Sequence, residues 1–531
     1  MTDTLRKGRF QTSNIAYFFI LIGCTLPLAA LQSWYLELAI SLLVLIGASW
    51  LTGRSLGSAA SGLVVVITIV LLKTNPPVLP LQYRLVGVLA FLVCILPLLL
   101  PPRQHAGFPL LGVFCAVQGV YIYMGALVGR PSAPFRVIYP TQIRDMGIVG
   151  SLVYVVVLVA AGLLTRRMNP IFPRIRHWTS RVTSIRAPRA TFWRALVLFT
   201  VGLVSARFLP ASVAGHLGDI PHIVGLARLL AFALMLILWF QGELTPLQKL
   251  VVVTMPIVDF AAGTSGIILL YNAAGVAIAG MITALVLRPR LAMWLLVFTM
   301  PILVVLNAAK TQARAAELTP LGHLAAAHAL ISDTANIALH PTPDTLTTSA
   351  DRFSTADLLG YIEFHVPSTY PYWNKKSYTE LPFVLVPRIL DPYKPTFGLA
   401  NEFGHKYGLI SPNDFSTAVD TPLQVEAWAN FGPEGLIGIA ILLGCLLGVG
   451  EGLISQTAFD GFALGVVVAY EVTGGVTSGI LGWALVIPAV IIFAPVARWA
   501  LGVSSSGLPP EDETPSIRPP HASDMQEASS P

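Results

Sequence analysis

Charged residues are the scarcest part of this sequence: only 11% of its 531 residues are Asp, Glu, Lys or Arg, whereas 55% are hydrophobic. Soluble domains carry about 25% charged residues, so the composition excludes a water-soluble globular protein. Cysteine is also rare, and the four cysteines lie inside apolar runs without the spacing of metal ligands: Cys24, Cys94, Cys115 and Cys445. We expect them to be small buried hydrophobic residues.

Three further absences narrow the class of protein. The apolar run after the basic start MTDTLRKGRF lacks a small-x-small exit and leads into another apolar run, so no cleavable signal peptide is expected. The two halves show no sequence repeat, which counts against a transporter built from inverted repeats. The basic residues behind the net charge of +6 cluster in loops that flank apolar runs. This pattern indicates membrane topology, and we expect no nucleic-acid partner.

Apolar runs long enough to cross a membrane are what the sequence has in abundance. Fourteen spans are predicted near residues 15–31, 34–51, 57–72, 85–100, 108–128, 147–164, 195–210, 223–240, 250–268, 270–287, 291–307, 433–454, 462–480 and 482–500. The turns within 250–287 and 462–500 are short, so the count is least certain there.

Basic loops give these spans an orientation. Arg6, Lys7 and Arg9 precede the first span, the 165–194 loop holds eight arginines, and residues 288–290 are Arg-Pro-Arg. With fourteen spans all three segments lie on one side, which the positive-inside rule makes cytoplasmic. Both termini are then cytoplasmic, and the 308–432 loop is periplasmic if the protein lies in a bacterial inner membrane.

The predicted fold class is therefore an all-α polytopic membrane protein with one long, partly helical outer loop. Four parts are expected: a membrane domain of about 11 helices at 1–307, the periplasmic loop at 308–432, three membrane helices at 433–502, and a disordered cytoplasmic tail at 503–531. Within the loop, residues 322–339, 353–365 and 420–432 have helical patterns. For the last we expect Thr421 as the N-cap and Pro422 at the first helical position.

The outer loop mixes aromatic and cationic residues. Its stretch LVPRILDPYKP, residues 385–395, sets Arg388 and Lys394 among prolines that limit backbone freedom. Aromatic faces pack against the apolar faces of sugars, and arginine binds phosphate oxygens through its planar fork. The combination favours a lipid-linked, phosphate-bearing sugar as substrate. The loop contains no Asp-x-Asp, and Glu402-x-x-His405 is not duplicated, so we expect no metal and no cofactor.

The same region resembles a known family. Its order of F-V-x-x-P-R, K-P, N-x-F-x-x-x-Y-G and E-A-W-x-N-F-G-x-x-G is similar to the oligosaccharide repeat-unit polymerases (Wzy type) of bacterial surface polysaccharides. The residues that carry the likeness are Pro387, Arg388, Lys394, Pro395, Asn401, Phe403, Tyr407, Gly408, Glu426, Asn430, Phe431, Gly432 and Gly435. They cover about fifty residues; elsewhere the likeness is one of topology.

This resemblance implies a metal-independent, GT-C-like glycosyltransferase of the bacterial inner membrane. Such an enzyme joins undecaprenyl-pyrophosphate-linked O-antigen or exopolysaccharide repeat units on the periplasmic side, with a flippase and a chain-length regulator as further expected partners. The catalytic candidates are Arg388, Glu426, His365 and His405. The substrate-binding candidates are Lys394, Arg228, Arg207, Trp373, Tyr393, Tyr407 and Trp428.

Each candidate also has a structural interpretation. Arg388 and Lys394 either clamp pyrophosphate or lie at the loop–membrane boundary. Arg228, inside a span, either binds the same pyrophosphate or pairs with Asp259, Glu37 or Glu471; Arg207 has similar alternatives. Glu426 is the preferred base, with His365 and His405 as weaker ones, and each is alternatively an ordinary helix or loop residue.

Two alternative functions stay open. An O-antigen ligase-like transferase has the same topology and differs only in the acceptor. A polysaccharide flippase or exporter needs no catalytic outer loop, and the acids Asp259 and Glu471 inside predicted spans favour it.

Overall fold

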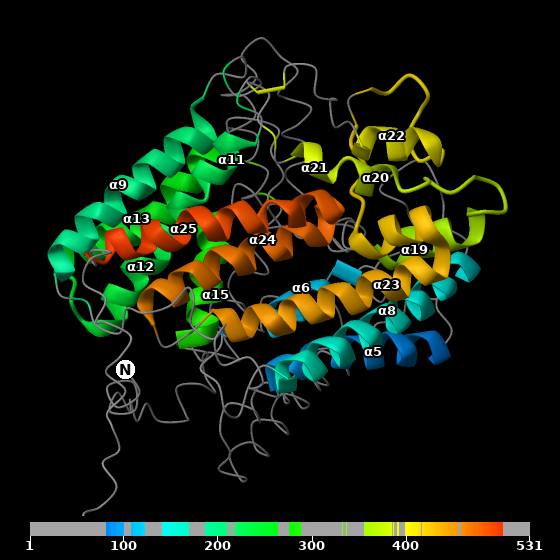
Figure 1. The fold of residues 1–531 in the computed structure, drawn as a ribbon, viewed down its shortest axis with the longest axis horizontal. Helices are drawn as coiled ribbons and strands as arrows, with labels where there is room; N and C mark the ends of the chain where they lie inside the picture. Colours follow the sequence, from blue (N-terminus) through cyan, green and yellow to red (C-terminus); the bar gives the residue numbers. More distant parts are fainter. Residues whose placement is uncertain are drawn as a thin grey trace, which may run out of the picture.

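The computed structural model describes the chain in segments, and every element in those segments is a helix (Figure 1). The described residues are 81–99, 108–119, 121–122, 141–168, 185, 187–209, 213, 217, 219–263, 275–287, 332, 336, 355–384, 386, 390–391, 399–415, 417–454 and 458–502. Within them the predicted all-helical fold class is confirmed.

The helices in the first part of the chain are α5 (Leu81–Leu99), α6 (Leu110–Gly119), α8 (Thr141–Met168), α9 (Pro188–Arg207), α11 (Ile220–Gly225), α12 (Ala227–Gln241), α13 (Pro246–Gly263) and α15 (Gly275–Leu287). Those in the second part are α19 (Thr355–His365), α20 (Lys376–Thr379), α21 (Leu381–Val384), α22 (Leu399–Lys406), α23 (Leu423–Leu453), α24 (Phe459–Ala484) and α25 (Val486–Ala500).

Five stretches among the described residues are long and apolar enough to cross a membrane: Gln142–Met168, Pro188–Arg207, Ile220–Gln241, Leu423–Leu453 and Gly482–Ala500. Each predicted span between residues 85 and 287, and each one after residue 432, overlaps a helix. The predicted spans 15–31, 34–51, 57–72 and 291–307 lie outside the described residues. The full count of fourteen therefore stays a prediction.

Small residues bring α8 and α23 together. A Cβ on Gly444 would meet the Leu158 carbonyl and lie 2.9 Å from Ala161 Cβ, and one on Gly448 would lie 3.0 Å from Thr165 Cβ. Residue numbers rise together along the contact, so the two helices run parallel. Between helices in lipid, such close backbone approach replaces the hydrophobic effect as the source of packing energy.

Ion pairs mark one end of the bundle, which we call the basic end. Arg166 on α8 donates to Glu451 on α23 through Nε at 2.5 Å and Nη2 at 2.8 Å, and both residues are buried. Arg498 on α25 pairs with Asp460 at 3.2 Å. Arg194 donates to the Trp499 carbonyl. The ends of α8, α23 and α25 and the starts of α9 and α24 therefore lie together.

The opposite end, the capped end, carries the short helices of the predicted loop (Figure 1). Helix α19 packs along the first turns of α8, where Arg144 Nε and Nη2 each donate to one Asp357 oxygen at 2.6 Å. Both side chains are only 1% exposed. This bidentate salt bridge links the predicted loop to the membrane domain. The predicted helix at 322–339 lies outside the described residues, apart from residues 332 and 336.

Two glycines interrupt the long helices near the capped end. The predicted helix at 420–432 is instead the first part of α23, and the break falls at Gly432, whose φ is 68°. Pro422, not Thr421, is the N-cap residue, and it makes no side-chain cap hydrogen bond. Helix α24 breaks in the same way at Gly479, whose φ is 69°. Only glycine adopts such angles without strain.

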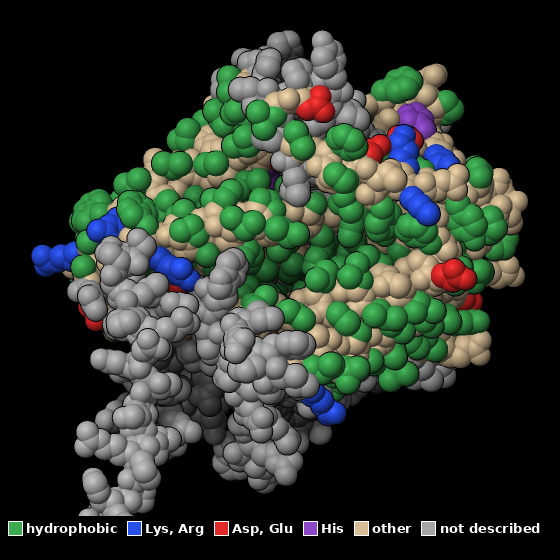
Figure 2. Space-filling model, in the orientation of Figure 1, with side chains coloured by type: hydrophobic (Ala, Val, Ile, Leu, Met, Phe, Trp, Pro, Cys, Tyr) green, Lys and Arg blue, Asp and Glu red, His purple; other side chains and the backbone are tan. Residues whose placement is uncertain are grey.

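The surface agrees with a membrane protein that has a polar cap. Hydrophobic side chains cover the visible face over α23, α8 and α5, whereas Lys and His side chains gather over α20 and α22 (Figure 2). Exposed apolar residues on α23 include Ile437, Ile441, Leu442 and Leu446. Exposed apolar groups in such numbers are stable in lipid and would aggregate in water.

Two glycines on the same helix test the packing of α8 against α23. Gly444→Ala places a methyl group against the Leu158 carbonyl and should cost about 1–3 kcal/mol by overpacking. Gly438→Ala is the matched control, because nothing lies within 4 Å of its Cβ position; it should be neutral or stabilise by about 0.5–1 kcal/mol through helix propensity. Thermal unfolding of the purified protein in detergent measures both. Equal melting temperatures for the two variants would contradict the contact.

Candidate functional site

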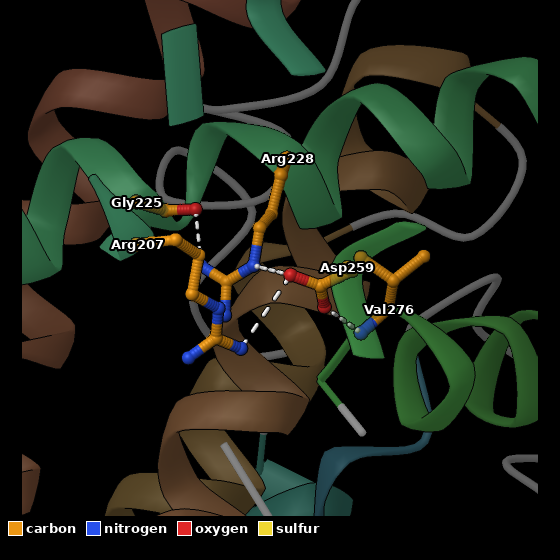
Figure 3. A network of polar contacts seen from close by, with 5 residues as sticks. All are labelled: Arg207, Gly225, Arg228, Asp259 and Val276. Atoms are coloured by element: carbon orange, nitrogen blue, oxygen red, sulfur yellow. Dashed lines mark hydrogen bonds and ion pairs between the residues drawn. The ribbon is translucent and has the colours of Figure 1, made fainter. Parts of the chain in front are cut away.

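Three charged side chains meet between membrane helices (Figure 3). Asp259 Oδ1 on α13 accepts from Arg228 Nε on α12 at 3.0 Å and pairs with Arg207 Nη2 on α9 at 3.5 Å. Asp259 is fully buried, and the two arginine side chains are 6% and 3% exposed. Arginine stays protonated, so two cations contact the same carboxylate.

Backbone groups complete the trio. Arg228 Nη1 donates to the Gly225 carbonyl at 2.5 Å, and Asp259 Oδ2 accepts from the Val276 N–H at 3.2 Å. Glycines make room for the guanidinium: a Cβ on Gly275 would lie 3.1 Å from Arg228 Nη2, and one on Gly225 would lie 3.2 Å from Nη1. Gly202 lets α9 approach the Arg228 backbone. These contacts hold the side chain of Arg228 in one conformation.

A second polar pair lies beside the trio. His222 Nε2 on α11 is 3.2 and 3.3 Å from the two carboxylate oxygens of Glu471 on α24. The Glu471 side chain is 5% exposed, whereas that of His222 is 44% exposed. The position of a Cβ on Gly275 is also 3.2 Å from Tyr470 Oη, so Tyr470 borders both groups. We call Arg207, His222, Arg228, Asp259, Tyr470 and Glu471 the membrane polar cluster.

This cluster lies well away from the basic end. Asp259 follows the start of α13 at Pro246 by 13 residues, a rise of about 20 Å along the helix. The hydrocarbon core of a bilayer is about 30 Å thick. The cluster is therefore nearer the capped end than the basic end, in apolar surroundings that strengthen electrostatic attraction.

Glu426 occupies a different environment. It is 2% exposed in the first turn of α23, where its Oε2 accepts from the Ile480 N–H at 2.8 Å. The break at Gly479 frees that N–H, and a Cβ on Gly479 would overlap Glu426 Oε2. Ser377 donates to the carboxylate, and Asn430 Nδ2 donates to Ser377 Oγ at 3.1 Å. Glu426 thus ties α20 and α23 to the kink in α24, and its role as a base stays a prediction.

The two predicted histidines lie in the cap among aromatic rings. His365 Nδ1 lies 3.2 Å from Thr369 Oγ1, and its ring centroid is 4.4 Å from that of Tyr361. Partial burial lowers the pKa of His365 below its ordinary value. The ring of His405 lies 5.5 Å from that of Phe415. Among the described residues, no contact of either histidine with the membrane polar cluster is seen, and their catalytic roles stay predictions.

The predicted sugar-binding aromatics that the structure describes form the core of the cap. Trp373 and Tyr407 are buried around Phe403, with ring centroids 5.2 and 4.7 Å from it. Trp428 packs at the edge of the hydrophobic core. Arg388, Lys394 and Tyr393 lie outside the described residues, so their predicted roles are untested. Of the predicted cationic site residues, the structure brings Arg207 and Arg228 together.

Several polar residues were not singled out by the sequence analysis. His222 stands one residue before the predicted 223–240 span, and the signal that could have found it is the helix start at Asp219-Ile-Pro-His. Arg144 pairs with Asp357, which lies 213 positions later in the sequence. No local sequence pattern predicts such a long-range pair. Within the described residues, no group of three or more His, Cys, Asp or Glu side chains could hold a metal ion.

Glu363 is another unpredicted residue. It lies on α19 against Gly150 of α8, and its Oε1 is buried without a hydrogen bond among the described groups. Burial raises the pKa of this carboxyl to about 8, so the side chain is neutral at pH 7. Burying a neutral carboxyl against an apolar helix costs much less free energy than burying an ionised carboxylate.

Glu363 predicts how stability depends on pH. The folded-state pKa of about 8 exceeds the ordinary value of 4.5, so the folded state binds the proton more tightly than the unfolded state. Stability should therefore fall as pH rises from 4.5 towards 8. Glu363→Gln should flatten this fall, as measured by thermal unfolding across that range. Glu243→Gln, at an exposed carboxylate, is the control. An unchanged pH dependence in Glu363→Gln would refute the account.

No protein-family model, curated protein or solved structure matches the chain.

Proposed function

We propose that the chain is an inner-membrane polymerase that joins undecaprenyl-pyrophosphate-linked oligosaccharide repeat units on the periplasmic side. The observation that carries the proposal is the arginine pair on Asp259. Two guanidinium groups lie together inside an apolar bundle, and both contact the carboxylate of Asp259. Such a site suits an anionic group that enters from the membrane rather than from water.

The leaving group of the reaction has the matching chemistry. A sugar that departs from a lipid pyrophosphate leaves negative charge on phosphate oxygens, and arginine forks stabilise such charge as it develops. Arg228 is fixed by Asp259 and the Gly225 carbonyl, so little reorganisation is needed at the moment of reaction. Arg388 and Lys394 of the outer loop remain predicted partners of the same pyrophosphate.

The capped end supports a sugar-binding role. Helices α19, α20 and α22 form a folded unit joined to the membrane domain by the Arg144–Asp357 pair. The unit carries half-buried cations, including Lys376, which pairs with Glu402, and Lys406, which donates to the Tyr372 carbonyl. A folded cap over the outer end of a membrane bundle is what a transferase needs to position sugars, whereas a passive anchor needs none.

Export of the lipid-linked unit is the second candidate function. Charged groups between membrane helices and the interruptions at Gly432 and Gly479 are features that transporters use around a central site. A transporter would move the unit across the membrane without joining it to another. The location of the uncondensed unit therefore separates the two functions.

A variant of Arg228 tests the polymerase. Arg228→Lys keeps the charge beside Asp259 and loses the fork; it should cut polymerisation about 10²-fold, the usual cost of one transition-state donor. The measurement, in the native host, is the length of surface polysaccharide on a gel at matched protein level. Arg194→Lys, at the basic end, is the control and should keep wild-type length.

Each outcome has a definite meaning. Loss of long polymer with single repeat units at the cell surface supports the polymerase. Wild-type polymer length in Arg228→Lys and in Arg228→Gln would overturn the role of the arginine pair. Lipid-linked units that accumulate on the cytoplasmic side would transfer the assignment to export, and loss of glycan on the final acceptor with normal chain length would favour a ligase.

A further inference from the structure

The pair formed by His222 and Glu471 is not explained by packing alone. Their heavy atoms are 3.2 Å apart, yet one partner is 5% exposed and the other is 44% exposed. A pair that served only to hold α11 against α24 would gain from enclosing both side chains. Here the carboxylate is enclosed and the imidazole stands in front of it, as in a nucleophile or base that is oriented by a buried acid.

The local structure fixes the position of the imidazole. Pro221 occupies the first turn of α11, and its carbonyl accepts from Ser205 Oγ of α9 at 3.1 Å. His222 is therefore held from both sides, by α9 through Pro221 and by α24 through Glu471. The charged groups that act on it are Glu471 on α24, Arg228 on α12 and Asp219 at the start of α11.

The hydrogen bond assigns the tautomer. Nε2 lies at hydrogen-bond distance from an acceptor-only carboxylate, so Nε2 carries the proton and Nδ1 presents its lone pair. Among the described residues, no hydrogen bond of the protein involves Nδ1. The imidazole can thus accept a proton at Nδ1, while Glu471 stabilises the imidazolium that forms.

His222 lies near the arginine pair that contacts Asp259. The charge of Arg228 influences His222 electrostatically, and Arg228 also forms the trio with Arg207 and Asp259. A cation site for a departing anion and a base for an entering hydroxyl thus lie within electrostatic range of each other. Glycosyl transfer needs both groups at the reacting carbon.

We propose that His222, oriented by Glu471, is the general base that deprotonates the attacking sugar hydroxyl. This inference rests on the proposed polymerase function. The hydroxyl oxygen forms a bond to the anomeric carbon of the growing chain, and its proton moves to His222 Nδ1. The bond from that carbon to the pyrophosphate oxygen breaks, and its electron pair stays on the pyrophosphate beside Arg207 and Arg228.

Glu426 is less well placed for this step. Its carboxylate is 2% exposed and accepts hydrogen bonds from the Ile480 N–H and Ser377. Glu426 contacts α24 at Gly479, eight residues beyond Glu471, which is about 12 Å along the helix. A base so enclosed and so far from the arginine pair would have to give up its hydrogen bonds before it met a substrate.

The test uses the full-length protein in lipid nanodiscs with undecaprenyl-pyrophosphate-linked repeat units extracted from the native host. His222→Gln should lower kcat about 10²-fold or more with little change in KM, which is the usual contribution of a general base. Its residual activity should lack the acidic limb of the wild-type pH–rate profile, because no imidazole remains to be protonated. Added imidazole should partly restore His222→Ala.

Glu471 is a positioning residue, and Glu471→Gln should lower kcat about tenfold with KM unchanged. Glu243→Gln, an exposed carboxylate at the end of α12, is the matched control. A His222→Gln rate within about threefold of wild type, or an acidic limb that persists in that variant, would overturn the proposal. If the wild-type protein itself makes no polymer from these units, the polymerase function fails, and the role of His222 as its base fails with it.

Discussion

A charge buried between apolar helices must find a partner of opposite sign, and this requirement organises the described part of the molecule. Arg166 meets Glu451 and Arg498 meets Asp460 at the basic end, Arg144 meets Asp357 under the cap, and two arginines meet Asp259 between them. Breaking such a buried pair by removing one partner typically costs about 3–5 kcal/mol. The pairs Arg166–Glu451 and Arg144–Asp357 join helices that are far apart in the sequence, 285 and 213 positions, so they specify which helices are neighbours.

Small residues allow those pairs to form. Gly444 and Gly448 let α23 approach α8, while Gly202, Gly225 and Gly275 leave room around Arg228. The breaks at Gly432 and Gly479 bring the first turn of α23 against α24, where Glu426 satisfies the backbone N–H that the second break exposes. Close packing therefore comes from the absence of side chains, and the polar groups that it brings together acquire fixed orientations.

The sequence predicts the class of fold because hydropathy and span length are properties of single segments. The sequence places Arg228 inside a predicted span, where burying a charge costs free energy. Asp259 was one of three partners that the sequence offered for it. The choice of Asp259, the addition of Arg207 and the pairing of His222 with Glu471 depend on which helices are neighbours. A single sequence holds no local signal for that arrangement.

The boundaries of the helices also could not be predicted from the sequence alone. Residues 420–432 have the pattern of a separate short helix, yet the structure joins them to α23 across Gly432, since one glycine in a permitted left-handed conformation changes direction without ending the helix. The aromatic residues Trp373 and Tyr407 have the composition of a sugar platform, and the structure places them around Phe403 in the core of the cap. Composition gives the kind of residue present, whereas exposure follows only from the fold.

The central claim is that the arginine pair on Asp259 binds the pyrophosphate of a lipid-linked substrate. The most direct measurement compares undecaprenyl pyrophosphate with undecaprenol, which has the same tail and no phosphate, for binding to the purified protein by native mass spectrometry. The account predicts that the wild-type protein binds the pyrophosphate at least about tenfold more tightly, since hydrogen bonds to charged groups contribute about 1.5–3 kcal/mol. Arg207→Gln/Arg228→Gln should lose that preference. Equal affinity for the two lipids in the wild-type protein, or an unchanged preference in the double variant, would contradict it.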